Sequence, residues 1–276
     1  MNWVDLILNI AGLLLWLNWR AGKADPLSKR TPATLIGTLR SAAPQKMRRW
    51  DVPLVLAALI LLRAVFYWLI GPALRWSGTL NLGIISLSFR SDKFGRILLF
   101  SALSFALALG IFYSCIILFS LLKGPKPVHD FVRMQLGRID GWTRTLKCFL
   151  PLVVTALCWW LTSWLLAWLQ IIPQPSPARR IEEALIIATQ GYVLWQFPIA
   201  AVLVLYLLNS YIYFGRHPIW SYVDGTAQTL LKPLKVIPFL RIGKVDLKPV
   251  VGIALVFLIA QLAEWGVVVL YKRLSG

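Results

Sequence analysis

The chain has few of the residues that catalysis and metal binding use. Its 276 residues include two histidines, three cysteines and 11 aspartates plus glutamates. Cys115, Cys148 and Cys158 form no CxxC pair and have no cysteine–histidine metal spacing, so we expect them to be reduced and buried among apolar residues. His129 and His217 lie in basic connections between apolar runs, which argues against a haem held by two histidines.

Sequence motifs for catalysis are also missing. The chain has no glycine-rich phosphate loop, no HExxH motif and no nucleophile elbow. Its few acidic residues lie almost entirely at the ends of apolar runs, where helix capping or salt pairing explains them. We therefore expect no enzyme activity, no metal and no cofactor.

Charged residues are scarce, and most of them are basic. They make up 14% of the chain against 58% hydrophobic residues, and the mean hydropathy is +0.70, which is typical of a membrane protein. In a soluble chain a net charge of +18 would favour nucleic acid, but here the basic residues lie between apolar runs of membrane-spanning length. We expect anionic lipids as partners, and no nucleic acid.

Six apolar runs are long enough to cross about 30 Å of hydrocarbon. They are residues 3–19, 53–71, 97–122, 148–172, 187–214 and 249–271. The first run has the length of a signal peptide, but its amino end carries Asp5 and no Lys or Arg, so we expect it to be retained. The sequence predicts an all-α membrane protein with six transmembrane helices.

Basic residues are distributed unevenly among the connections. Residues 20–50, 123–147 and 215–248 hold eight, six and six Lys and Arg, whereas the other two connections and the carboxyl tail hold four, two and two. Strongly basic connections stay in the cytoplasm. We expect a multi-pass protein of the bacterial inner membrane, with these three connections inside and both termini outside.

A unit of span, basic connection and span recurs along the chain. "GPKPVHDFV" at 124–132 aligns with "GRHPIWSYV" at 215–223, and "FLPLVVTAL" at 149–157 aligns with "LKPVVGIAL" at 247–255. A weaker copy contains "TPATLIGTLRSAAPQKMRRWDVPLVLAAL". We predict three tandem helical hairpins and, after the first, an extracytoplasmic connection; in chain order they are residues 1–75, 76–96, 97–172 and 173–276.

Each cytoplasmic connection is expected to form an elbow, by which we mean the amphipathic interfacial segment between the two spans of a hairpin. Apolar residues recur there every three or four positions, which places them on one face of a helix. In the third copy they are Ile219, Val223, Ala227, Leu230, Leu234 and Ile237, and in the second Val128, Phe131, Val132, Leu136, Ile139, Trp142 and Leu146. We expect these faces to point into the lipid.

Local signals in the third elbow fix where its pieces begin and end. Pro233 should kink or end the first helix, Asp246 is placed to cap the last span, and Pro249 falls in the first turn of that span. Basic residues of the elbows are expected to contact lipid headgroups. They are Lys232, Lys235, Arg241, Lys244, Arg48 and Arg49.

The third elbow also carries a resemblance to a known family. "GRHPIWSYV" and the following "LLKPLKVIPFLRIGKVDLKPVV" resemble the YggT family of small bacterial membrane proteins, also called YlmG and Ycf19. The resemblance is close over residues 200–270, moderate over 100–170 and faint over 1–72. Its motif residues are Gly215, Pro218, Pro233, Pro238, Gly243, Asp246 and Pro249. It implies hairpin repeats and roles in osmotic or ion tolerance, cell division or membrane organisation, with no agreed reaction.

Polar side chains within the predicted spans allow two interpretations. Arg63 and Glu264 would each cost roughly 2.5–3.5 kcal/mol to insert unpaired. Measured from Pro53 and Pro249 they differ in depth by roughly 7 Å, which a long arginine can bridge, so we expect them to form one buried pair. The alternative is a polar path for ions that also includes Asn9, Asn209, Gln196 and Gln261.

Two functional hypotheses follow. The preferred one is a non-catalytic scaffold or assembly factor, whose basic elbows rest on the cytoplasmic leaflet and whose spans bind other membrane proteins or a second copy. The alternative is a small ion channel or osmotic-stress transporter with a polar path near Arg63 and Glu264.

Residues 77–96 fit either a short strand or an interfacial helix, because their alternation at Leu80, Leu82, Ile84 and Ile85 does not distinguish the two.

Overall fold

A computed structural model gives the structure of the chain. It describes residues 3–24, 51–73, 76–83, 85–91, 93–122, 126–174, 176–212, 218–236, 241–242 and 245–275. These residues are mostly helical, and five helical segments among them are long and apolar enough to cross a membrane. The five are Asp51–Ile70, Phe94–Leu121, Arg144–Trp168, Pro177–Tyr211 and Lys248–Arg273. The chain therefore has the character of a multi-pass, largely α-helical membrane protein.

The five segments correspond to the last five of the six predicted runs. The first run also forms a helix, α1 (Trp3–Ala24), but it is not among the five. Its 22 residues would extend about 33 Å, so its polar content and not its length sets it apart. A sixth span at α1 stays a prediction.

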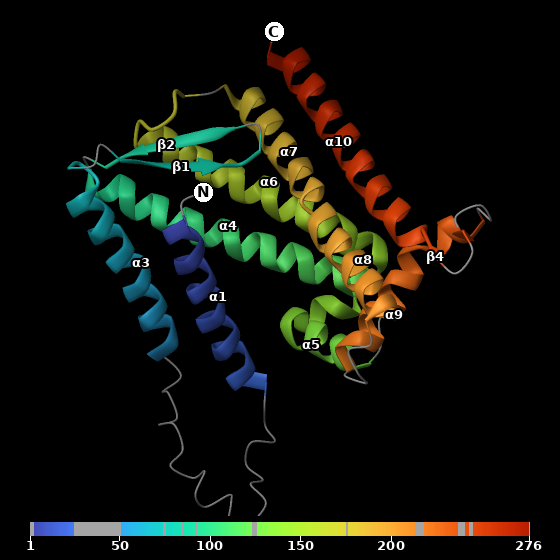
Figure 1. The fold of residues 1–276 in the computed structure, drawn as a ribbon. Helices are drawn as coiled ribbons and strands as arrows, with labels where there is room; N and C mark the ends of the chain where they lie inside the picture. The colour runs from blue at the N-terminus through green and yellow to red at the C-terminus, as the bar shows by residue number, and fades with distance from the viewer. Residues whose placement is uncertain are drawn as a thin grey trace, which may run out of the picture. The chain divides into compact units, whose positions relative to one another are not determined.

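The chain divides into two compact units. The first contains α1, α3 (Asp51–Ile70), the strands β1 (Ser77–Asn81) and β2 (Ser86–Arg90), and α4 (Phe94–Leu121) as far as Leu109 (Figure 1). Helix α1 packs against α3. It also approaches α4 closely, because a Cβ added at Gly12 would lie 2.6 Å from the Phe105 ring.

Ser77–Asn81 and Ser86–Arg90 form a β-hairpin, which decides between the two structures that the sequence left open. The strands are antiparallel, with Ser77 opposite Arg90. Alternate residues face inward, as the two-residue period of a strand requires. The buried ones are Gly78, Leu80, Leu87 and Phe89. Phe89 packs on Phe100 of α4 with ring centroids 5.6 Å apart, so this apolar face is covered by the first unit itself.

The second unit contains Leu82–Ile85, the rest of α4 and the chain that follows α4. Its elements are α5 (Lys126–Leu136), η2 (Gly137–Gly141), α6 (Arg144–Trp168), α7 (Pro177–Val193), α8 (Gln196–Tyr211), α9 (Pro218–Leu230), η3 (Lys232–Val236), β3 (Arg241–Ile242), β4 (Val245–Asp246) and α10 (Lys248–Ser275). Helix α6 packs along α7, and α10 packs along α8 and α7. Helices α7 and α8 together make up one membrane-spanning segment.

The elbow after α4 folds back onto that helix. Val132 and Leu136 of α5 are buried against Ile116 and Ile117 of α4. The prediction of an amphipathic elbow helix is confirmed here, but the prediction that this apolar face points into the lipid is wrong for its buried residues. Periodicity locates an apolar face without showing what covers it. Three other predicted members of the face are exposed, namely Phe131, Trp142 and Leu146.

The elbow after α8 repeats this arrangement. Ala227 of α9 and the following Leu231 are buried against Val202 and Leu203 of α8, so protein again covers the predicted apolar face. Tyr222 of α9 meets Phe119 edge-on, with ring centroids 6.1 Å apart. Burial raises the pKa of the Tyr222 phenol, so this side chain remains neutral at physiological pH.

The three local signals in the third elbow act as predicted. Helix α9 ends at Leu230, and Pro233 lies in the 3₁₀ helix η3 that follows. The Asp246 carboxylate accepts a hydrogen bond from the backbone N–H of Lys248, the first residue of α10, at 3.1 Å. Pro249 is the second residue of α10 and is fully buried.

Gly71 lies at a turn of the first unit where two parts of the chain approach closely. It follows α3 directly, where the chain leaves the helix for the hairpin. A Cβ at this position would lie 2.3 Å from the Tyr67 carbonyl oxygen and 2.6 Å from Ser91 Cβ. Because both neighbours belong to the backbone or are attached to it directly, no side-chain rotation can relieve the overlap.

We therefore expect Gly71→Ala to lower the free energy of unfolding by about 1–3 kcal/mol, since the turn must shift. Gly95→Ala is the matched control: it lies in the first turn of α4, and a Cβ there would meet nothing within 4 Å. It should change the stability by less than about 0.5 kcal/mol. SDS titration in mixed micelles measures both, and equal stability of the two variants would contradict the close packing at Gly71.

Candidate functional site: a buried polar cluster in the first unit

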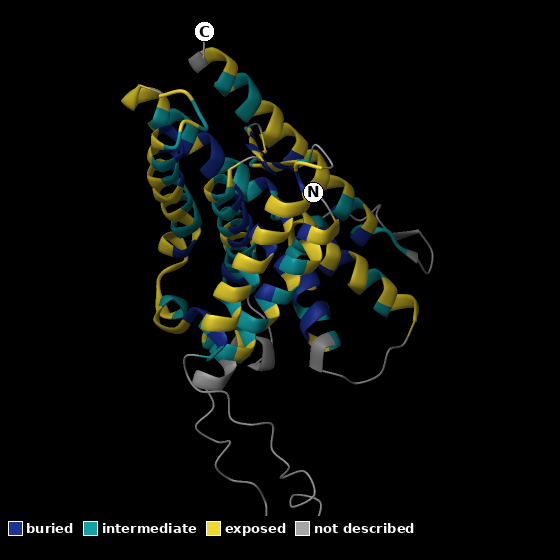
Figure 2. Ribbon diagram, turned by 90° about the vertical axis from the view of Figure 1, so that its left-hand side faces the viewer, coloured by how far each residue is buried: buried dark blue, intermediate teal, exposed yellow. Residues whose placement is uncertain are grey.

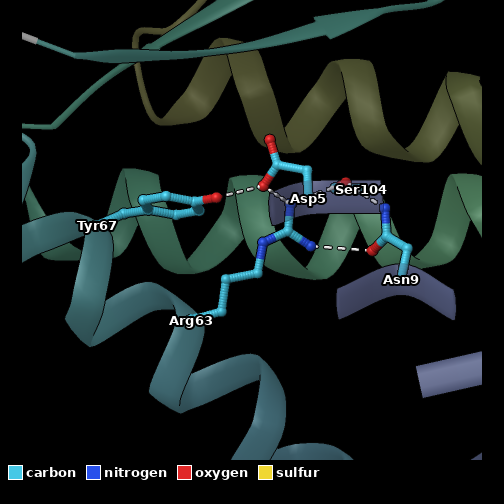
Figure 3. A network of polar contacts seen from close by, with 5 residues as sticks. All are labelled: Asp5, Asn9, Arg63, Tyr67 and Ser104. Atoms are coloured by element: carbon cyan, nitrogen blue, oxygen red, sulfur yellow. Dashed lines mark hydrogen bonds and ion pairs between the residues drawn. The ribbon is translucent and has the colours of Figure 1, made fainter. Parts of the chain in front are cut away.

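Three helices of the first unit bring five polar side chains together (Figure 3). We call Asp5, Asn9, Arg63, Tyr67 and Ser104 the polar cluster. Asp5 and Asn9 are four residues apart on α1, and Arg63 and Tyr67 are four apart on α3, so each pair projects from one face of its helix. Ser104 comes from α4. Each of the three helices therefore contributes polar side chains to the same place between the helices.

The Arg63 guanidinium is at the centre of the polar cluster. Its Nη2 donates to Asp5 Oδ1 at 2.7 Å and to Ser104 Oγ at 3.0 Å, and its Nη1 donates to Asn9 Oδ1 at 2.9 Å. Tyr67 Oη donates to the same Asp5 oxygen at 2.7 Å, and Asn9 Nδ2 donates to Ser104 Oγ at 3.0 Å. The hydrogen bonds join all three helices into one network.

Burial makes this network important for stability. Arg63 is 3% exposed and Asp5 is 5% exposed, so neither charge has access to solvent. The guanidinium carbon also lies 5.2 Å from the centre of the Phe100 ring and 5.9 Å from that of Tyr67, which favours a cation at this position. The opposite charges compensate each other, so the cluster as a whole is neutral.

The structure gives Arg63 a different partner from the one predicted. Arg63 is paired with Asp5 in the first unit and not with Glu264, whose side chain is exposed on α10. Asp5 lies near the amino end of the chain, away from the middle of any predicted span, so depth along the spans does not point to it. The signal that identifies it is the spacing of Asp5 and Asn9, two polar residues one turn apart on an otherwise apolar helix face.

A second buried ion pair lies in the second unit and was not predicted. Lys147 of α6 donates to Asp140 Oδ1 of η2 at 3.0 Å and to Ser120 Oγ of α4 at 2.7 Å, and Ser120 donates to Asp140 at 2.7 Å. Both charged side chains are less than 10% exposed. These three residues, which we call the elbow cluster, fix the second elbow between the two spans that it connects.

The other predicted polar residues of the spans have separate environments. Asn209 of α8 donates to both carboxylate oxygens of Asp224 in α9, at 3.1 and 3.2 Å, and so links the third elbow to its span. Gln196 is half-buried at the start of α8, whereas Gln261 and Glu264 are exposed on α10. Within the second unit, these predicted residues do not form a single network.

The structure places only part of the predicted elbow residues. Lys232 is exposed in η3, while only the backbone is described for Pro218, Lys235 and Arg241. The remaining predicted positions lie outside the described residues. They are Arg48, Arg49, Gly215, Pro238, Gly243 and Lys244.

Among the described residues, no group of three or more His, Cys, Asp or Glu side chains is placed to hold a metal ion. Comparisons of the chain with known protein families, with curated proteins and with solved structures find no match. The resemblance to the YggT family therefore stays a prediction from the sequence.

The pairing of Arg63 with Asp5 predicts a specific pattern of stability. Arg63→Met leaves Asp5 buried without a cation and should lower the free energy of unfolding by about 3–5 kcal/mol. The double variant Asp5→Leu/Arg63→Met removes both charges and should be more stable than Arg63→Met. SDS titration of the wild type, both single variants and the double variant measures the coupling. Additive losses in the double variant would show that the two side chains do not interact.

Proposed function

We propose that this protein is a non-catalytic membrane scaffold or assembly factor whose basic elbows bind the anionic surface of the cytoplasmic leaflet. In this proposal α1 is a sixth span, the three hairpins are repeats related to the YggT family, and both termini lie outside the cytoplasm. The spans then present surfaces to other membrane proteins.

The observation that carries the proposal is the way the second elbow is fixed. Its helix α5 is held to α4 by Val132 and Leu136, so the opposite side is left to the surroundings. Arg133, Arg138 and Arg144 are all exposed along this elbow. The elbow therefore buries Val132 and Leu136 against α4 and leaves its three arginines exposed.

The buried and the exposed charges of the second elbow differ in their partners. Lys147 and Asp140 neutralise each other inside the elbow cluster, so neither is available to bind lipid headgroups. The exposed arginines have no such partner among the described residues. A basic residue close to an anionic bilayer surface gains about 1 kcal/mol, so several on one rigid elbow together favour an anionic leaflet.

The polar cluster gives less support to the ion-channel alternative. Both terminal nitrogens of the Arg63 guanidinium are hydrogen bonded to protein groups, and its charge is balanced by Asp5. An ion pathway needs polar groups that face water and can replace the hydration shell of an ion. A neutral, buried network that joins three helices is better suited to hold those helices together.

The scaffold proposal predicts that the elbow arginines enrich anionic lipid around the protein. Arg133→Gln/Arg138→Gln should lower the retention of phosphatidylglycerol over phosphatidylcholine by about fivefold for each arginine removed, since each contributes about 1 kcal/mol. The matched control is Arg179→Gln/Arg180→Gln, which removes two arginines from the start of α7 instead. Native mass spectrometry of protein released from mixed-lipid nanodiscs counts the bound lipids. Equal losses from the two variants would contradict a specific role for the elbow.

A further inference from the structure

Helix α10 exposes two polar side chains inside an otherwise apolar membrane-spanning segment. Gln261 and Glu264 are both exposed, and they are three residues apart, so they lie on neighbouring parts of one helix face. No hydrogen bond or ion pair joins Glu264 to any other residue that the structure describes. The function proposed above does not use either side chain.

Their depth places them in hydrocarbon. Glu264 lies 16 residues after Lys248 and eight before Lys272, or about 24 Å and 12 Å along the helix from these two basic residues near its ends. A carboxyl group at such a depth is costly unless another group compensates it, and intramembrane acidic residues are therefore expected to have a partner. The described part of the second unit supplies none.

The remainder of α10 is covered on one side only. Its buried residues, Pro249, Gly252 and Ala260, face the unit, where a Cβ at Gly252 would lie 2.8 Å from Leu231 and 3.4 Å from Leu203. In Figure 2 the helix that ends at C is mostly yellow and teal. Large exposed side chains surround the two polar ones, among them Phe257, Leu258, Leu262 and Trp265.

We propose that α10 is a homodimerisation surface, on which Gln261 of one copy donates to the Glu264 carboxyl group of a second copy, and reciprocally. The two side chains make the face complementary to itself, because it carries an amide donor and a carboxyl acceptor side by side. A two-fold axis pairs residue i with residue j in both directions. Copies inserted in the same orientation bring their α10 helices together in parallel, and the offset of three residues amounts to about 4.5 Å, within reach of a glutamine side chain.

A second copy explains the face better than a basic partner helix does. A lone carboxylate would call for Lys or Arg on the partner, but here Gln261 provides the donor next to the acceptor. Interhelical hydrogen bonds of this kind stabilise association of helices in membranes. The exposed Trp265 and Leu262 supply apolar contact around the polar pair.

The experiment measures the monomer–dimer equilibrium of the full chain by single-molecule photobleaching in liposomes at several protein-to-lipid ratios. We expect dimers for the wild type. For Glu264→Leu and for Gln261→Leu we expect the association constant of the dimer to fall by about tenfold or more. Glu264→Gln keeps a hydrogen-bonding side chain and should retain the dimer. Ile259→Ala is the control: it also removes an exposed side chain, but from a position about 160° around the helix from Gln261.

Each outcome has a defined meaning. A monomeric wild type at every ratio, or a dimer that Glu264→Leu leaves unchanged, would overturn the proposal. Equal weakening by Glu264→Gln and Glu264→Leu would also overturn it, since the charge and not the hydrogen bond would then matter, as for a basic partner. Circular dichroism and SDS titration establish that each variant folds.

A cross-linking measurement locates the contact independently. In a variant with Cys115, Cys148 and Cys158 replaced by alanine, Trp265→Cys should form disulfide-linked dimers under oxidation, whereas Ile259→Cys should not. Cross-linking through Ile259→Cys alone would place the dimer on another face and overturn the proposal. Because these variants leave the elbow arginines intact, failure of the dimer would leave the lipid-enrichment test of the scaffold unaffected.

Discussion

A charge buried between membrane helices needs an opposite charge in direct contact, and this constraint determines how the first unit is held together. Arg63 meets it with Asp5 at 2.7 Å, and Asn9, Tyr67 and Ser104 complete the network. The network thereby joins α1, α3 and α4 at one point. Removing both charges is expected to cost less than removing one, because the unpaired remainder carries the desolvation penalty. The effect of each charge on stability therefore depends on the presence of the other.

The second unit also pairs its buried charges, in the elbow where the chain reverses direction between two spans. Lys147 and Asp140 are buried together with Ser120, and in the third elbow Asn209 of α8 is bonded to Asp224 of α9. In both elbows a short helix lies against the span before it, and that span covers Val132 and Leu136 in the second elbow and Ala227 in the third. Polar bonds position the elbow and apolar contacts hold it there. Arg133, Arg138 and Arg144 of the second elbow are left exposed, and the scaffold proposal rests on these three residues.

Much of this architecture could be predicted from local sequence signals. Hydropathy located five segments of spanning length, because continuous apolar character is a property of the segment itself. Pro233, Asp246 and Pro249 act through neighbouring backbone atoms, so their effects at helix ends were also predictable. The partner of Arg63 was not, since it depends on which helices meet. The hairpin was obscured for another reason: Gly78 occupies an inward position, and a glycine adds no apolar signal to an alternating pattern.

The central claim, that Arg63 is neutralised by direct contact with Asp5, is tested most directly by solid-state NMR of the protein in lipid bilayers. With ¹⁵N in the guanidinium of Arg63 and ¹³C in the carboxyl group of Asp5, a separation corresponding to the 2.7 Å contact between Nη2 and Oδ1 should give strong dipolar dephasing. The same labels in an Asp5→Asn variant identify the signal. Absence of dephasing in the wild-type protein would place the two groups apart and contradict the account.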